Sequence, residues 1–202
     1  MDVVSRITFL PPVLCFLFNV ASLSQGNDQK LPGCEWCGAD EAPSNVSWLT
    51  TIAGKDEPGQ RIIIRGKVTK ADGVSPASDV VLYVYHTNAK GIYGRKGNET
   101  GNGRRHGYLR GWMKTDSTGR YEFRTIRPGA YPGGTNPEHV HVTVKEAVKQ
   151  EYWIDDFHFE DDPLLTPASR THLQNRGGSG VLTLKPGRDG IPEAVRNITL
   201  LK

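Results

Sequence analysis

The sequence has no strong excess of charge of one sign and no apolar run long enough to cross a bilayer. Its 202 residues include 25 Lys and Arg and 22 Asp and Glu, which gives a net charge of +3. No basic run with interleaved aromatic residues, the usual signature of a nucleic-acid-binding surface, is present. The apolar run Ile7–Val20 has 14 residues, whereas a membrane-spanning helix needs about 20. We therefore expect neither a nucleic-acid partner nor a membrane span.

The beginning of the chain has the layout of a secretory signal peptide. Arg6 precedes the apolar run, and Ala21 and Ser22 supply small residues near a plausible cleavage point. This order of a basic residue, an apolar stretch and small residues is typical of export signals. The layout predicts a signal peptide over residues 1–26 and a secreted protein, extracellular or periplasmic.

Cysteine is scarce, with three residues in the chain. The first, Cys15, could carry a lipid anchor instead of lying in a cleaved signal peptide, but the bulky Val13 and Leu14 before it fit an anchor poorly. The other two, Cys34 and Cys37, are predicted to form a local disulfide, the usual state in an exported chain. A redox motif would precede a helix in a βαβ unit, and a zinc site would need a second ligand pair. The sequence offers neither.

The sequence also lacks a convincing segment with helical periodicity, and no internal repeat is evident. Short β-branched and aromatic runs alternate with turn signals, a pattern typical of antiparallel sandwiches. The expected strands are Arg61–Thr69, Asp79–Thr87, Arg120–Ile126, Glu138–Lys145, Tyr152–Phe159, Gly180–Lys185 and Val195–Leu201. We therefore predict an all-β fold over residues 60–202, an antiparallel β-sandwich of about seven to eight strands with long connecting loops.

Two segments do not fit this strand pattern. Residues 27–59 are polar with scattered Pro and Gly, and they are predicted to form an extended N-terminal arm. Residues 88–118 are rich in Gly, Arg and Asn and are predicted to form one long connection, which contains Tyr93. Connections of this length in a compact domain tend to carry function or to be disordered.

Two histidines lie two residues apart in the alternating run His-Val-His-Val-Thr-Val. On a strand, this spacing places His139 and His141 on one face and the valines on the other. Two imidazoles held side by side can bind one metal ion, and together with hard phenolate oxygens they suit iron better than zinc. Of the other histidines, His86 is expected near the ligands rather than as a ligand, and His158 and His172 are expected to be structural or exposed.

The sequence around these histidines resembles the iron-ligand signature of the intradiol ring-cleavage dioxygenases, the family of catechol and protocatechuate dioxygenases. In "RYEFRTIRPGAYPGG…HVHV", a tyrosine follows Pro-Gly-x and a His-x-His strand comes next. Upstream, "GKVTKADGVSPASDVVLYVYHTNAKGIYGR" is similar to the strand pair that ends in the family's first ligand tyrosine. The resemblance covers roughly residues 60–165.

The resemblance implies four protein ligands to one Fe(3+) per chain. Tyr93 matches the equatorial tyrosinate that stays bound, and Tyr131 matches the axial tyrosinate. His139 and His141 match the equatorial and axial imidazoles. Tyr131 is also implied to be the catalytic base, because in the family this ligand leaves when a catechol chelates the metal and accepts a substrate proton.

The implied activity is that of an exported oxidoreductase. Its substrates would be O₂ and a small catechol-type aromatic. The ring would be cleaved between the two hydroxylated carbons to give a muconate-type diacid.

The chain departs from the family pattern at two positions. Better-known members carry an arginine three residues before the first ligand histidine, where this chain has Asn136. A glutamine expected after the histidine pair is replaced by Asp156. Both positions are predicted to contact substrate, and the missing arginine leaves the substrate range open.

A basic stretch in the long connection could compensate for the missing arginine. The candidate substrate-binding residues there are Arg104, Arg105, His106 and Arg110, with Tyr108 and Trp112 as possible walls against an aromatic ring. The alternative is a solvated basic loop.

Two other interpretations of the whole chain remain. One is a non-catalytic, transthyretin-like β-sandwich that binds a ligand or partner and has a decayed iron site. The other is a metal-dependent enzyme with a different substrate. The colour of the purified protein would separate the first from a ferric dioxygenase, because tyrosinate bound to Fe(III) absorbs visible light. The oligomeric state is not predicted.

Overall fold

The structure is a computed structural model and describes residues 1, 37–187 and 189–202. Residues 2–36 contain nearly all of the predicted signal peptide as well as Cys34, so these predictions lie outside the described part. The described chain is mostly strand, with two one-turn α-helices, α1 (Gly103–His106) and α2 (Pro167–Arg170), and one 3-10 helix, η1 (Ala39–Glu41). The all-β fold class is therefore confirmed.

The first sheet has five strands. Its order is β1 (Leu49–Thr51), β5 (Arg120–Ile126), β2 (Arg61–Thr69) and β10 (Glu193–Val195), and β11 (Ile198–Thr199) also pairs with β2. The long pair β2–β5 is antiparallel, whereas β1, β10 and β11 add in parallel.

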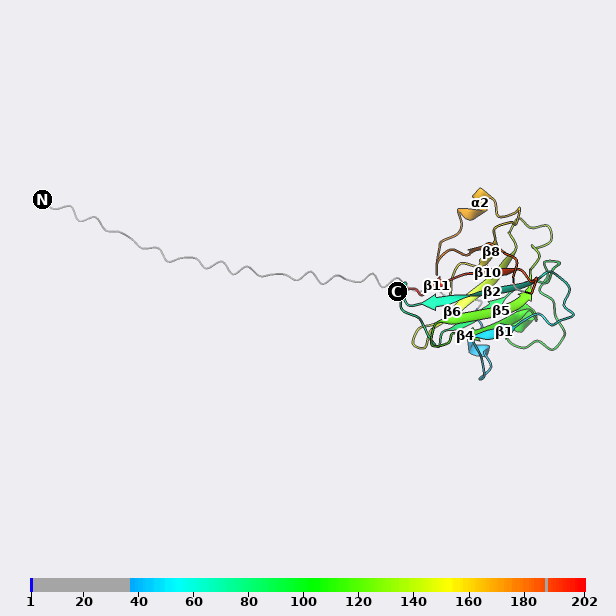
Figure 1. Cartoon of the computed structure of the whole chain (residues 1–202), viewed down its shortest axis with the longest axis horizontal. Coiled ribbons are helices and arrows are strands. Elements are labelled where there is room, and N and C mark those ends of the chain that lie inside the picture. Colours follow the sequence, from blue (N-terminus) through cyan, green and yellow to red (C-terminus); the bar gives the residue numbers. More distant parts are fainter. Residues whose placement is uncertain (2–36, 188) are drawn as a thin grey trace.

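The second sheet has six strands and carries the histidine pair. Its order is β4 (Arg110–Lys114), β3 (Val81–Tyr85), β6 (His139–Lys145), β8 (Phe157–Phe159) and β9 (Val181–Leu182), and β7 (Tyr152–Trp153) also pairs with β6. All pairs are antiparallel except β8–β9. In Figure 1, α2 lies beyond β8, at the opposite side of the molecule from β1.

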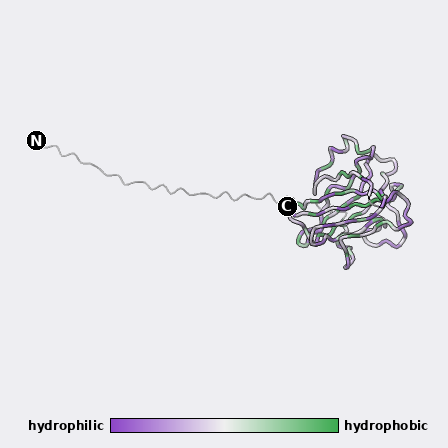
Figure 2. The backbone as a smooth tube through the Cα atoms, in the orientation of Figure 1, coloured by the Kyte–Doolittle hydropathy of each residue, from purple (hydrophilic) through white to green (hydrophobic). Residues whose placement is uncertain are grey.

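The main hydrophobic core contains side chains from both sheets. Ile64 and Phe123 of the first sheet are fully buried, as are Val84, Val140 and Phe157 of the second. A core shared by two sheets is the arrangement expected of a sandwich. Figure 2 shows the hydrophobic stretches gathered along the strands, with the hydrophilic residues mainly in the surrounding loops.

The structure corrects the predicted strand pattern in three respects. The pairing is mixed rather than wholly antiparallel, and the described residues form eleven strands. One of them, β4, lies inside the predicted long connection 88–118. The predicted strand Tyr152–Phe159 is interrupted between β7 and β8, and the last predicted strand is divided into β10 and β11. These differences arise from short strands whose partners lie far away in sequence.

Part of the predicted arm 27–59 is built into the domain. Strand β1 belongs to the first sheet, and the backbone N–H groups of Gly38 and Ala39 donate to the carboxylate of Glu151 at 3.0 and 2.9 Å. Cys37 is disulfide-bonded. The segment around η1 is thus attached to the outer face of the second sheet.

Candidate metal centre

Tyr93 is positioned by a tight turn after β3. The side chain of Asn88 accepts hydrogen bonds from the N–H groups of Lys90 and Ile92, and Gly91 has a φ of 76°, in the left-handed region. A Cβ atom at Gly91 would lie 1.9 Å from the carbonyl oxygen of Ala130. Only glycine allows both this backbone conformation and this close approach. The turn that carries Tyr93 therefore packs directly against the segment that carries Tyr131.

The segment before Tyr131 is fixed from the other side. The N–H of Gly129 donates to the carbonyl of Asn88 at 2.9 Å, and the hydroxyl of Thr87 donates to the carbonyl of Gly129 at 2.7 Å. A Cβ at Gly129 would lie 2.6 Å from the carbonyl oxygen of Ala89. This backbone contact brings two tyrosines that are 38 residues apart in sequence to the same place.

The histidine pair lies on β6, as predicted. The intervening Val140 and the next valine, Val142, are buried in the main core, while His139 and His141 are half-buried on the opposite face of the strand. The imidazoles therefore face away from the core, on the outer face of the second sheet.

The four predicted ligand atoms converge. Tyr93 Oη lies 2.6 Å from Tyr131 Oη and 2.8 Å from His141 Nε2. Tyr131 Oη lies 3.2 Å from His139 Nε2 and 3.3 Å from His141 Nε2, and the two Nε2 atoms are 3.2 Å apart. The centre of such a group is roughly 2 Å from each atom, a normal metal–ligand distance for nitrogen and oxygen.

The hydrogen bonds of the two histidines leave both Nε2 lone pairs directed at this centre. His139 Nδ1 lies 2.6 Å from the carbonyl oxygen of Pro137, which can only accept, so this nitrogen carries the proton. His141 Nδ1 lies 3.1 Å from Asp156 Oδ2 and donates in the same way. Two unprotonated Nε2 atoms 3.2 Å apart cannot bond to each other. The hydroxyls of Tyr93 and Tyr131 can donate to His141 Nε2 and His139 Nε2, at 2.8 and 3.2 Å. Once these protons are lost, the two lone pairs and the two phenolate oxygens point at one centre, so these residues fit a metal ion.

The pKa values agree with a neutral ligand set. Burial lowers the pKa of His139 to about 4, which keeps its imidazole neutral. Burial raises the pKa of both Tyr93 and Tyr131, and the hydrogen bond between them raises that of Tyr93 further. The phenols thus keep their protons near neutral pH, and a metal ion that binds between them must displace these protons.

Asp156 lies behind His141 rather than among the four converging atoms. One of its oxygens comes within 4.8 Å of possible ligand atoms of His139 and His141. Its contact, however, is with Nδ1 of His141, on the ring edge away from Nε2. Although burial opposes it, the electrostatic interaction with His141 and the hydrogen bond from His141 Nδ1 lower the pKa of Asp156. An ionised carboxylate here orients the imidazole and makes it a stronger donor.

The ring of His141 is also held by a stack that the sequence did not reveal. Tyr85 is its cross-strand neighbour on β3, with ring centroids 4.5 Å apart at 25°. On its other side Tyr85 stacks on His106, at 3.7 Å and 6°. His106 Nδ1 in turn lies 2.7 Å from the hydroxyl of Tyr83. The signal for this stack was the aromatic alternation of β3, where Tyr83 and Tyr85 share a face.

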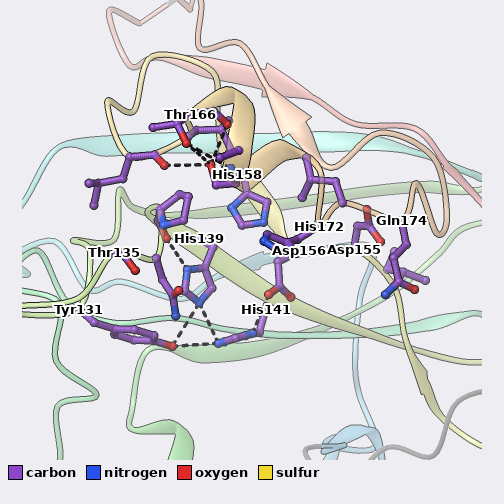
Figure 3. Close-up of a pocket in the computed structure, with 18 of the residues that line it drawn as sticks. Tyr131, Thr135, His139, His141, Asp155, Asp156, His158, Thr166, His172 and Gln174 are labelled. Carbon is purple, nitrogen blue, oxygen red and sulfur yellow. Dashed lines mark hydrogen bonds and ion pairs between the residues drawn. The ribbon is translucent and has the colours of Figure 1, made fainter.

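A cavity of about 810 Å³ opens beside the ligand atoms (Figure 3). Tyr131, His139 and His141 lie at one end of it. Figure 3 shows Thr166 and Gln174 away from them, Thr166 beyond His158 and Gln174 beyond Asp156. Tyr131 is among the described residues that line the cavity, and Tyr93 is not. A small molecule in the cavity would therefore approach the four ligand atoms from the side of Tyr131.

The structure brings two of the predicted substrate-binding residues to this cavity, Asn136 and Asp156. The other six, on α1, just before β4 and on β4, are not among the described residues that line it. Arg110 pairs with Glu41 at 2.5 Å, and the Tyr108 hydroxyl donates to Glu57 at 2.8 Å. His106 is buried under Tyr85.

The remaining members of that group also lie elsewhere. Arg104 and Arg105 have exposed side chains. The indole of Trp112 donates to the carbonyl of Gly38 at 2.7 Å and stacks on Tyr83, with centroids 5.3 Å apart. Neither of the two predicted aromatic walls therefore faces the cavity.

The other histidines divide between core and cavity. His86 is buried, and its two ring nitrogens lie 2.7 Å from the carbonyl of Thr87 and from the hydroxyl of Thr125. His158 lies opposite His139 in the pairing of β6 with β8 and lines the cavity, as does the exposed His172. The prediction that His158 and His172 are structural or exposed did not anticipate their place on the cavity wall.

The apolar part of the cavity wall was also missed from sequence. It is formed by Trp153, Ile154, Leu164, Leu165, Ala168 and Leu173. The signal in the sequence was their position on either side of Asp156, the one residue of this region that was expected near substrate.

The chain matches the family model described as "Dioxygenase" over residues 37–171, more than half of its length. It therefore belongs to this family, that of the intradiol ring-cleavage dioxygenases. No helix among the described residues is long and apolar enough to cross a membrane.

Two characterised relatives illustrate the family. The chain is 34% identical to the protocatechuate 3,4-dioxygenase beta chain of Burkholderia cepacia over 125 residues, which cover 58% of this chain and 53% of that one. It is 32% identical to catechol 1,2-dioxygenase 1 of Acinetobacter lwoffii over 126 residues, covering 54% and 39%. The match thus spans about half or less of the length of these relatives.

Solved structures share the fold. The dioxygenase domain of a dioxygenase–carbohydrate-binding fusion from Streptomyces sp. SirexAA-E aligns with a TM-score of 0.58 at 20% identity, covering 79% of this chain and 92% of that one. An intradiol ring-cleavage dioxygenase from Tetranychus urticae aligns with a TM-score of 0.55 at 18% identity, covering 78% and 88%.

Proposed function

We propose that this protein is a non-haem, Fe(III)-dependent intradiol dioxygenase with one ferric ion per chain. It inserts O₂ between the two hydroxylated carbons of a catechol-type aromatic and releases a muconate-type product. The observation that carries this proposal is the convergence of Tyr93, Tyr131, His139 and His141 at one end of a cavity.

The donor set suits the proposed ion. Two phenolate oxygens are hard, anionic ligands that favour Fe(III), and imidazole nitrogen is a common partner of iron. A ferric ion bound there supplies Lewis acidity toward a catechol that chelates it. The names of the two relatives, a protocatechuate and a catechol dioxygenase, support the same reaction class.

The two tyrosines have different positions and therefore different roles. Tyr131 lines the cavity and reaches the centre from that side, so it is the ligand that an arriving catechol can replace. Its phenolate oxygen is then free to accept a proton from a catechol hydroxyl. Tyr93 lies behind it, outside the cavity lining, and stays in place.

The histidines provide fixed ligands. Pro137 holds the tautomer and orientation of His139 through its carbonyl, and Asp156 does the same for His141. The stack of His141 on Tyr85 restricts its rotation. The cavity beside them provides the space for the catechol ring.

The test is turnover with labelled oxygen. The purified protein, loaded with Fe(III), is given catechol under ¹⁸O₂, and the product is analysed by mass spectrometry. We expect a ring-opened diacid that contains both atoms of one O₂ molecule, with no product from the iron-free protein. A quinone without added oxygen would contradict the proposal. Full iron loading without any turnover would favour the non-catalytic sandwich.

We also propose that the protein is exported. The signal layout of residues 1–26 supports export, and so does the disulfide bond of Cys37, because disulfides persist mainly in oxidising compartments. Expression of the full chain followed by N-terminal sequencing of the protein in the medium or periplasm tests it. A mature protein that retains Met1 inside the cell would contradict it.

A further inference from the structure

The cavity is much larger than a single catechol ring needs. Its volume of about 810 Å³ lies toward the upper end of the range for sites that take drug-sized ligands, roughly 300–1,000 Å³. A ring held at Tyr131 and the histidines therefore leaves space toward Thr166 and Gln174, where Figure 3 shows the cavity continuing.

The wall of this additional space includes an apolar, preformed surface. It includes Trp153, Leu164 and Leu173. The guanidinium of Arg176 lies 3.5 Å from the centroid of the Trp153 ring and its Nη2 donates to the Trp153 carbonyl, which fixes this indole. The N–H of Leu164 donates to Asp162 at 2.9 Å. A fixed apolar wall favours an apolar part of a ligand, because burial of apolar surface is favourable and no ordering cost remains.

The segment that carries Leu164 is held in place by contacts between its two ends. Arg170, the last residue of α2, forms an ion pair with Glu160 at 2.9 Å. The hydroxyl of Thr166 accepts the N–H of Ser169 and thereby caps α2. Residues 160–170 thus form a short loop whose first and last residues are joined by an ion pair.

The described lining of the cavity contains no side chain with a permanent positive charge for an anionic substituent. Among the described residues that line it there is no lysine or arginine. Of its two carboxylates, Asp155 accepts the N–H groups of Asn175 and Arg176 at 2.8 and 3.2 Å, and Asp156 pairs with His141. A carboxylate on the substrate ring would lose water contacts and gain no lysine or arginine partner among the described lining residues.

We propose that the site takes catechols that carry a neutral, extended substituent, such as the ester of a dihydroxybenzoic acid, and discriminates against the free acid. The dihydroxylated ring lies at Tyr131 and the histidines, and the substituent lies along the Trp153–Leu173 wall. This inference rests on the proposed function, since it concerns the substrate of the same centre.

The main experiment uses a matched series of ligands on the Fe(III)-loaded protein. Protocatechuate, its methyl ester and its ethyl and butyl esters are titrated without oxygen, and Kd is read from the visible absorption. We expect the methyl ester to bind about tenfold or more tightly than the acid. Each additional methylene should tighten binding roughly threefold to fourfold until the wall is filled.

Two results would overturn the inference: an acid that binds as tightly as its methyl ester, or esters whose Kd does not change with chain length. Ring cleavage is measured separately with oxygen. Absence of cleavage for all these catechols would refute the proposed function, while the order of Kd values would still decide the inference.

Variants of the wall give a second, independent readout. Trp153→Ala should reduce the advantage of the butyl over the methyl ester by about fivefold or more. Gln174 is exposed. Gln174→Arg should tighten the binding of the acid relative to that of its methyl ester by about twofold to fivefold, and Gln174→Glu should weaken it to a similar extent. Equal effects of the two Gln174 variants on acid and ester would place the substituent elsewhere and overturn the assignment.

Discussion

The two sides of the ligand cluster differ in charge and in free space. On the side of α1 and β4 the chain is rich in basic and aromatic residues. Three of these side chains contact other parts of the protein: Arg110 pairs with Glu41, Tyr108 with Glu57 and His106 with Tyr83. On the side of β7, β8 and α2, apolar and polar side chains surround a cavity of about 810 Å³, and the described lining residues include no lysine or arginine.

This comparison shows that a charged residue close to the ligands in sequence does not necessarily face the substrate in the structure. The basic stretch supports the centre from behind, through the stack of His106 on Tyr85 and of Tyr85 on His141. In the proposed function, the substrate lies on the other side, along the Trp153–Leu173 wall. Substitutions on the two sides should therefore affect different properties.

The largest effect is expected at the ligand on the cavity side. Tyr131→Phe removes one ligand and the base that accepts a catechol proton. It should shift the visible band of the ferric protein and lower kcat/KM by about 10²-fold or more. Tyr108→Phe is the matched control on the other side and should leave the band unchanged. Identical spectra and kinetics for Tyr131→Phe and the unmodified protein would show that Tyr131 is not a ligand.

A smaller effect is expected at the carboxylate behind His141. Asp156→Asn keeps a hydrogen-bond acceptor but removes the charge that strengthens the imidazole. The affinity for Fe(III) should fall by roughly 10- to 100-fold, as for other residues that orient metal ligands. Competition with a chelator measures it. Asp161→Asn, which alters an exposed partner of Arg127, is the control. A loss as large in the control would mean that the effect is not specific to the centre.

The smallest effect on catalysis is expected at Arg110. Arg110→Ala leaves Glu41 without its ion-pair partner, so the free energy of unfolding should fall by about 1–3 kcal/mol. Because Arg110 does not line the cavity, kcat/KM for acid and ester should keep the same ratio within about twofold. Denaturant unfolding and steady-state kinetics measure both quantities. If the ratio of kcat/KM between acid and ester changed while the free energy of unfolding did not, Arg110 would be a substrate-binding residue after all.

The parts of the site that follow from local pattern were predictable from the sequence. Period-two alternation placed His139 and His141 on one face of a strand, and the structure has this arrangement on β6. The turn glycines Gly91 and Gly129 mark the backbone contact that brings the two tyrosines together, but their partners became visible only in the fold. The choice of Tyr93 among the tyrosines came from the family resemblance, not from periodicity.

Features that depend on distant partners were not predictable in this way. Strand β4 was missed because glycine and arginine dominate its neighbourhood, and it is defined by its pairing with β3. The parallel addition of β1 and β10 also depends on where far segments return. The basic and aromatic residues of α1 and β4 were expected at the substrate because sequence gives their chemistry but not their partners. Glu41, the partner of Arg110, and Glu57, the partner of Tyr108, both come from the N-terminal segment.

The most direct test of the central claim is the position of the iron and of a bound ligand. A crystal of the Fe(III)-loaded protein, soaked without oxygen with the butyl ester of protocatechuate, gives the iron position from anomalous diffraction. We predict one ion within about 2–2.5 Å of Tyr93 Oη and of the Nε2 atoms of His139 and His141. The catechol should replace Tyr131, with the butyl group against Trp153. An ion held by Asp156 with Tyr93 turned away, or a butyl group on the side of Arg110, would contradict this account.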